Sequence, residues 1–189
     1  MPPLLLSFLL SVVYIAGGGI LANIIGEALP RRVFRPESAL YRPRRWERDG
    51  KCYEKFGIRR WKDHVPDMSR VRKKKMVSKH LGTEAFPTAE RVRILAQETC
   101  RAETVHAVLC LLSPLILLFW IGPWIGLGVA VVVVYILCNL PFIMIQRYNR
   151  PPLVALEARL RRREARRAEK RPEPEKEGNR QDESSDPLG

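Results

Sequence analysis

Two polar residues near the middle of the chain have the types and the spacing that general base catalysis requires. Glu103 and His106 lie three residues apart in "QETCRAETVH", so on a helix their side chains share one face. A carboxylate beside an imidazole raises its basicity and fixes its tautomer, which would let His106 take a proton from a hydroxyl group. Taken alone, the pair is better explained as two side chains that satisfy each other at a membrane boundary.

A second polar cluster follows the last apolar run. The stretch "IMIQRYNRPPLVAL" passes from hydrocarbon side chains to Arg147, Tyr148, Asn149 and Arg150, and then meets two prolines. Guanidinium groups and a neutral amide could bind a donor phosphate or stabilise an oxyanion. The same residues could instead form an ordinary membrane exit, with the arginines reaching lipid headgroups.

Further polar residues are expected at the same boundary, and motifs for other chemistry are missing. The additional candidates for substrate binding are Glu98, Arg101, Trp61 and Lys62, with Asp63 and His64 beside them. The chain has no Gly-x-Ser-x-Gly elbow, and its three histidines are scattered, so we expect neither a serine nucleophile nor a metal site. The four cysteines form no Cys-x-x-Cys pair and are expected to be small core residues.

The distribution of charge shows which elements must position these residues. The chain carries 33 Lys and Arg, yet residues 1–30 and 102–146 contain none. A soluble domain scatters charge over its whole surface, so this segregation predicts an all-α membrane protein. Crossing a hydrocarbon core takes roughly 20 apolar residues, which predicts spans at about 4–29, 105–121 and 124–145. Because no basic n-region precedes the first span, we expect a retained helix rather than a signal peptide.

The positive-inside rule predicts the orientation of these spans. The loop 30–104 carries 21 Lys and Arg against 10 Asp and Glu, and the chain after the third span carries 12 against 9. Both segments are therefore expected in the cytoplasm, with the amino terminus outside. Trp120 and Trp124, in the turn "WIGPWIG", are expected at the outer headgroup level.

The segments outside the spans have patterns of their own. Asp49–Gly50 predicts a turn, and Thr88 predicts the start of a helix that continues into the second span. "LVALEARLRRREARRAEKR" predicts a basic amphipathic helix, and the charged tail 166–189 is expected to be largely disordered. The run "RVRKKK" at 70–75 is typical of a solvated loop near anionic lipid, and no nucleic-acid module accompanies it.

Three of these blocks together resemble a known family. "RRWERDGKCYEKFGIRRWKD", "ETCRAETVH" and "IMIQRYNRP" occur in the order and spacing of the glycosyl-4,4'-diaponeurosporenoate acyltransferases, and the resemblance covers about residues 8–165. The chain departs from the family in its longer, more basic stretch at 67–79 and in its charged carboxyl-terminal extension. Family members esterify a fatty acyl chain onto a glucose hydroxyl of a glycosylated carotenoid acid, the last step of staphyloxanthin-type synthesis.

The resemblance implies a membrane acyltransferase domain over residues 1–165. It implies His106 as the base and Glu103 as its orienting carboxylate, with the polar residues of the boundary binding substrate. Acyl-CoA or acyl carrier protein would be the donor, with no cofactor, and other carotenoid-pathway enzymes would be partners. A non-catalytic membrane assembly factor or lipid-binding protein is the alternative, and that protein would tolerate substitution of Glu103 and His106.

Overall fold

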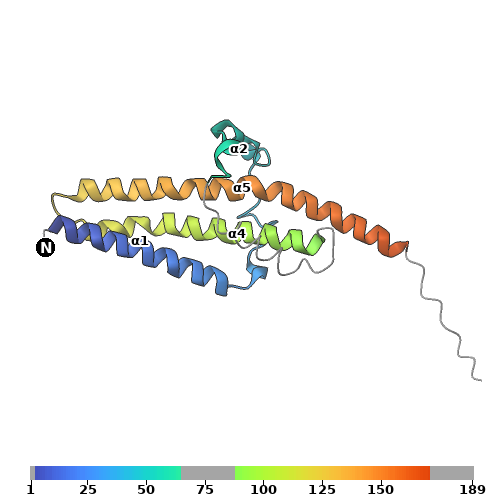
Figure 1. Ribbon diagram of the computed structural model, residues 1–189, viewed down its shortest axis with the longest axis horizontal. Coiled ribbons are helices and arrows are strands. Elements are labelled where there is room, and N and C mark those ends of the chain that lie inside the picture. Colours follow the sequence, from blue (N-terminus) through green and yellow to red (C-terminus); the bar gives the residue numbers. More distant parts are fainter. Residues whose placement is uncertain (1–2, 65–87, 171–189) are drawn as a thin grey trace, which may run out of the picture.

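Long helices lying alongside one another dominate the computed structural model, which describes residues 3–64 and 88–170 (Figure 1). They are α1 (Pro3–Ala28), α4 (Ala89–Leu112) with its 3-10 extension η4 (Ser113–Phe119), and α5 (Ile125–Glu169). These described ranges contain no strand, so the expected all-α fold is confirmed. The run 70–75 lies outside them.

Within residues 3–64 and 88–170, three helices are long and apolar enough to cross a membrane: Pro3–Ala28, Ala89–Phe119 and Ile125–Glu169. Their Leu, Ile and Val side chains are largely exposed, and α1 buries only Ser11 and Gly26. Apolar side chains on the outside suit a hydrocarbon solvent rather than water. The prediction of three membrane-spanning helices is confirmed.

The helix α4 begins in polar sequence and runs on into apolar sequence. Thr88 caps it by accepting a hydrogen bond from the backbone N–H of Arg91 at 3.4 Å, as the capping signal predicts. After Leu112 the chain tightens into η4, where Pro114 cannot donate to a helical carbonyl. One continuous rod therefore carries Glu98, Glu103 and His106.

The helix α5 is longer than the sequence indicates, because it continues through Pro151 and Pro152 to Glu169 (Figure 1). The basic amphipathic segment is thus the end of α5 and not a separate helix. Two prolines in succession leave the carbonyls of Arg147 and Tyr148 without helical donors. The turn at Gly50 packs on this point, so the short elements of the basic segment cover the interrupted part of the helix.

The basic segment after α1 folds into short pieces against α4 and α5 (Figure 1). They are η1 (Arg31–Val33), η2 (Arg45–Glu47), η3 (Lys51–Phe56) and α2 (Ile58–Trp61). The predicted turn is present, since Arg48, Asp49 and Gly50 all have positive φ. Tyr53 and Ile58 pack with Ile145 of α5, which fastens this segment to the long helix.

The opposite end of the bundle is closed around Trp120. Its side chain is 1% exposed and its indole N–H donates to the Ser11 hydroxyl at 2.8 Å. Trp120 therefore packs inside the bundle and does not face the headgroups, whereas Trp124 is 47% exposed. An indole N–H needs a partner when it is buried, and Ser11 of α1 supplies it.

Candidate active site

Four charged side chains meet where η2, α4 and α5 come together. Arg147 lies between two carboxylates. Its Nε donates to Glu47 Oε1 at 2.5 Å and its Nη2 to Glu47 Oε2 at 2.8 Å, while its Nη1 donates to Glu103 Oε1 at 2.5 Å. This paired geometry is the one that the planar guanidinium fork favours.

Arg150 completes the network and is 2% exposed. Its Nη2 pairs with Glu103 Oε2, its Nε donates to the Thr99 hydroxyl at 2.9 Å, and its Nη1 donates to the Tyr41 carbonyl at 2.8 Å. Its guanidinium also lies over the Tyr41 ring, 5.2 Å from the centroid. A buried charge needs this many partners to offset its loss of water.

Helical spacing and one tight turn bring these residues together. Arg147 and Arg150 are three residues apart on α5, and Thr99 and Glu103 are four apart on α4, so each pair shares a face. Glu47 comes from η2, where the backbone N–H of Arg44 donates to its Oε2 at 2.5 Å. The network therefore depends on the basic segment as much as on the spans.

The environment of Glu47 keeps it ionised. The side chain is 1% exposed, and burial works to raise its pKa. Hydrogen bonds from Arg147, from the Tyr53 hydroxyl and from the backbone of Arg44 outweigh burial and hold the pKa of Glu47 at about 2. Burial and the bond to Glu47 raise the pKa of Tyr53, so its hydroxyl stays protonated as the donor.

His106 lies one helical turn beyond Glu103, and its ring is held on two sides. Its Nδ1 lies 2.8 Å from Asn139 Oδ1, and the ring stacks on Phe142 with centroids 4.5 Å apart. The amide nitrogen of Asn139 donates to the carbonyl of Tyr135 at 2.9 Å, which turns the amide oxygen toward the imidazole. Nδ1 is then the donor, and Nε2 is the nitrogen that can accept a proton.

The predicted pairing of Glu103 with His106 stays a prediction. Both carboxylate oxygens of Glu103 bind arginine, one on Arg147 and the other on Arg150. The hydrogen bond at His106 Nδ1 goes to Asn139 instead. The structure thus offers Asn139 as an orienting group for the imidazole and gives Glu103 a role in holding the arginines.

The remaining predicted residues fall into smaller sets near this network. Lys62 lies over the Tyr148 ring, 4.9 Å from its centroid, whereas Trp61 donates to the Phe56 carbonyl at 2.9 Å. Glu98 pairs with Arg101 on α4, and Asn149 is half-buried beside Arg150.

Sequence reasoning missed Glu47 and Asn139. Asn139 had a usable signal, because a polar amide inside an otherwise apolar span is costly and often functional. Glu47 had a weaker one, as one acidic residue in the arginine-rich block "RPRRWERDG". In the described part of the chain, no three His, Cys, Asp or Glu residues are grouped as metal ligands would be.

A cleft of about 840 Å³ opens next to the network. It lies between the segment 36–49 and the stretch of α5 from Arg150 to Ala158, and its walls include Pro151, Pro152 and Val154. A volume of this size is typical of small-molecule sites. Arg150 is the residue that belongs to both the cleft and the buried network.

The fold and the site define a class of protein. It is a small membrane-spanning helical protein with a buried network of ion pairs, and an oriented imidazole lies one helical turn away from that network. Residues 36–159 match the sequence pattern of the glycosyl-4,4'-diaponeurosporenoate acyltransferase family. The chain belongs to this family and is an acyltransferase.

Relatives that carry the family's name have been found in Staphylococcus aureus. The proteins of strains MRSA252 and bovine RF122 / ET3-1 are each 33% identical to this chain over 144 residues, covering 76% of it and 82% of the relative. The protein of strain Newman is 32% identical over the same length. No solved structure matches the chain.

Proposed function

We propose that this acyltransferase moves a fatty acyl group from an activated thioester to a sugar hydroxyl of a glycosylated carotenoid acid or a similar glycolipid. The name of the relatives, glycosyl-4,4'-diaponeurosporenoate acyltransferase, supports the acceptor class. The observation that carries the chemistry is the hydrogen bond between His106 Nδ1 and Asn139, because an imidazole that donates through Nδ1 has Nε2 as its basic nitrogen.

The reaction needs one base and no covalent intermediate on the protein. His106 Nε2 takes the proton of the sugar hydroxyl as its oxygen attacks the thioester carbonyl carbon. The tetrahedral intermediate then collapses, the carbon–sulfur bond breaks, and the departing thiolate takes the proton from the imidazolium. An ester and a free thiol leave, so the proton count balances without a redox partner.

Arg147 and Arg150 act in this scheme as positioning residues. Each has most of its N–H groups committed to Glu47, Glu103, Thr99 or a backbone carbonyl, so the pair fixes α5 against α4 and η2. Asn149 and Tyr148 are half-buried on the same helix and are the polar groups offered to the sugar. The Tyr148 hydroxyl also contacts Arg59 and Glu54.

The membrane supplies the acceptor. The apolar carotenoid tail would lie along the exposed Leu and Ile faces of the spans, with its sugar at headgroup height near His106. The excess of Lys and Arg in 31–101 and 147–189 favours a cell-membrane protein with its amino terminus outside and both basic segments in the cytoplasm.

Reconstitution tests this function directly. The purified full chain, in phosphatidylcholine vesicles, is given an acyl thioester and a glucosyl ester of a carotenoid acid, and products are identified by mass spectrometry. The expected product is the acceptor with one acyl ester on the sugar. Ester formation on the lipid tail, or none with any glycolipid acceptor, would contradict the proposal.

A further inference from the structure

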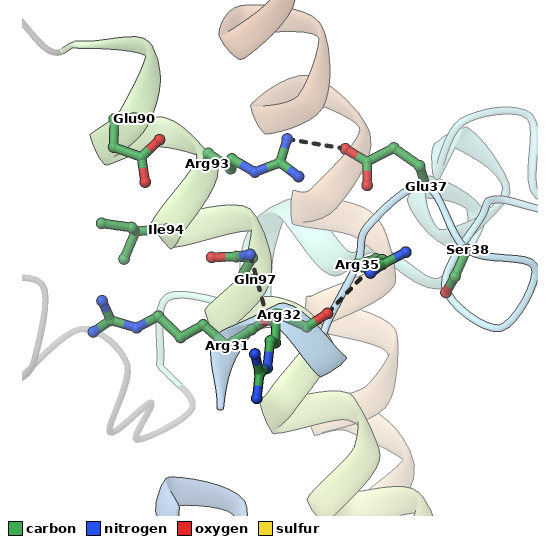
Figure 2. A pocket seen from close by; sticks show the side chains of 9 residues that line it. All are labelled: Arg31, Arg32, Arg35, Glu37, Ser38, Glu90, Arg93, Ile94 and Gln97. Atoms are coloured by element: carbon green, nitrogen blue, oxygen red, sulfur yellow. Dashed lines mark hydrogen bonds and ion pairs between the residues drawn. The ribbon is translucent and has the colours of Figure 1, made fainter. Parts of the chain in front are cut away.

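A second cleft, of about 790 Å³, lies where the segment after α1 meets the first turns of α4 (Figure 2). Four arginines line it, Arg31, Arg32, Arg35 and Arg93, together with Gln97 and Ser38. Its size is in the range of small-molecule sites, and its concave shape is unlike the flat patch that a protein surface would bind.

The charge of this cleft is not neutralised by its own carboxylates. Glu37 and Glu90 are its acidic lining residues, and Arg93 already pairs with Glu37 at 3.4 Å and with Glu157 at 3.1 Å. Within the described residues, Arg32 and Arg35 form no ion pair, and the Arg35 Nε donates only to the Arg32 carbonyl. Exposed guanidinium groups of this kind are ready to bind anions.

Arg31 pairs with Glu98 at 3.7 Å, so Arg32 and Arg35 are the arginines of the cleft that differ from those of the buried network. Arg147 and Arg150 are already bound to two carboxylates, so a donor phosphate would have to displace them. Figure 2 shows the side chains of Arg31, Arg32 and Arg35 pointing in different directions from the same short segment. Spread cations suit a ligand with several anionic groups at separate points rather than one phosphate ion.

We infer that this cleft binds the nucleotide phosphates of an acyl-CoA, so that it is the docking site of the acyl donor. The inference rests on the proposed function for the reaction that the donor enters. CoA carries a diphosphate and a separate phosphate at the end of a long, flexible pantetheine arm that bears the thioester. The arm would run from the cleft toward the bundle, with the thioester at its far end.

The position of the cleft fits that arm. A Cβ on Gly26, near the end of α1, would lie 3.0 Å from Val105, so α1 ends at the level of α4 that holds Glu103 and His106. Gln97, which lines the cleft, precedes His106 by nine residues, a distance of about 14 Å along the helix axis. The donor's phosphates would stay at the polar start of α4 while its thioester reaches the imidazole.

Equilibrium binding of free CoA tests the inference without any turnover. The full chain is placed in phosphatidylcholine nanodiscs and compared with Arg32→Gln/Arg35→Gln and with Arg162→Gln/Arg163→Gln, a control that removes equal charge from the exposed end of α5. Losing two charged hydrogen-bond donors should weaken CoA binding at least about tenfold in the first variant. The control should bind as the parent does, and pantetheine, which lacks phosphates, should not distinguish the three proteins.

Three results would overturn the inference. The first is equal CoA affinity in the parent and Arg32→Gln/Arg35→Gln. The second is that this variant loses a preference for phosphatidylglycerol over phosphatidylcholine within the nanodisc while its CoA affinity is unchanged, which would assign the cleft to lipid headgroups. The third is that Arg32→Gln/Arg35→Gln loses acyl transfer from acyl carrier protein but keeps acyl transfer from acyl-CoA. CoA binding is measured without an acceptor. The binding result can therefore be interpreted even if the proposed acyl transfer is not observed.

Discussion

At the scale of single residues, Glu47 shows how a charge is kept inside the folded chain. It accepts bonds from Arg147, Tyr53 and the backbone of Arg44, and these bonds hold its pKa at about 2, below the ordinary value of 4.5. A group with a lowered pKa stabilises the fold above its ordinary pKa, and the contribution is lost as the pH falls toward the lowered one. Glu47 therefore stays charged throughout the neutral range.

Substitution of Glu47 should have a pH-dependent cost. Glu47→Gln leaves Arg147 without half of its partners, and breaking a buried pair costs about 3–5 kcal/mol. We expect the unfolding midpoint to lie below that of the parent by the same amount at pH 7 and pH 5, with the gap narrowing by pH 3. Thermal unfolding in detergent measures this. Glu169→Gln, at the exposed end of α5, is the control, and a gap that persists unchanged to pH 3 would contradict the account.

Asn139 offers a second test at this scale, because its oxygen fixes the imidazole tautomer. Asn139→Ala should lower acyl transfer at least about tenfold with normal membrane insertion, since a misplaced base loses much of a general base's contribution. Asn139→Asp has the same shape and can accept the same bond, so it should retain more activity than the alanine variant. Activity of Asn139→Ala within twofold of the parent, or no advantage for Asn139→Asp, would argue for a packing role.

Some of the site could be predicted from residue types and spacing, and some could not. Glu103, Arg147 and Arg150 were expected at one boundary, and in the structure they are in contact. Arg147 and Arg150 share one face of α5, and that face packs against Glu103 of α4. Helical spacing does not say which side chain of another element faces that surface. Glu47 and Asn139, the partners that come from elsewhere in the chain, were therefore missed.

At the scale of elements, the turn at Gly50 joins the basic segment to α5. Gly50 has φ of +89°, and a Cβ there would lie 3.2 Å from Tyr148 Cα and 3.3 Å from its carbonyl oxygen. These atoms belong to the backbone of α5 and not to the flexible end of a side chain, so they cannot move aside cheaply. A glycine is required both by the conformation and by the space.

Gly57 provides a matched control for that turn. It also has positive φ, +66°, but a Cβ there would meet nothing within 4 Å. Both Gly50→Ala and Gly57→Ala should incur the left-handed strain of about 1–2 kcal/mol, and only Gly50→Ala should also push η2 off α5 and displace Glu47. The unfolding midpoint and the rate of acyl transfer should both fall further for Gly50→Ala than for Gly57→Ala. Equal effects of the two substitutions would contradict a close contact between Gly50 and α5.

The spans were predictable because charge is excluded from them, whereas the course of α5 was not. Sequence rules end a helix near a proline, yet α5 continues past two of them, held by the elements that pack on either side. The position of Trp120 was also not predictable from the sequence. An amphipathic indole ring is typical of the headgroup region, but in the fold its N–H has a buried partner, the Ser11 hydroxyl of α1.

At the scale of the whole molecule, the site and the arginine-lined cleft lie toward the same end of the bundle, away from the turn at Trp120. This arrangement allows an acceptor dissolved in the membrane and a donor dissolved in water to meet at one level. It requires the basic segments to face the compartment that supplies acyl thioesters.

Cysteine labelling checks that orientation. In a chain whose own four cysteines are replaced, Ile121→Cys, 83% exposed at the turn, should react with an impermeant reagent added to intact cells. Lys55→Cys, exposed on η3, should react only after the membrane is opened. The positive-inside rule predicts this result, and the reverse pattern would place the site on the other face.

The central claim is that His106 is the general base of acyl transfer to a sugar hydroxyl. Initial rates of ester formation by His106→Ala and the parent, at equal amounts of inserted protein in the same vesicles, test it most directly. Loss of a general base removes about 10²–10⁴-fold in rate, and we predict a loss in this range even though the amount of inserted protein is the same. A rate within a few-fold of the parent would contradict the claim and leave His106 as a packing residue between α4 and α5.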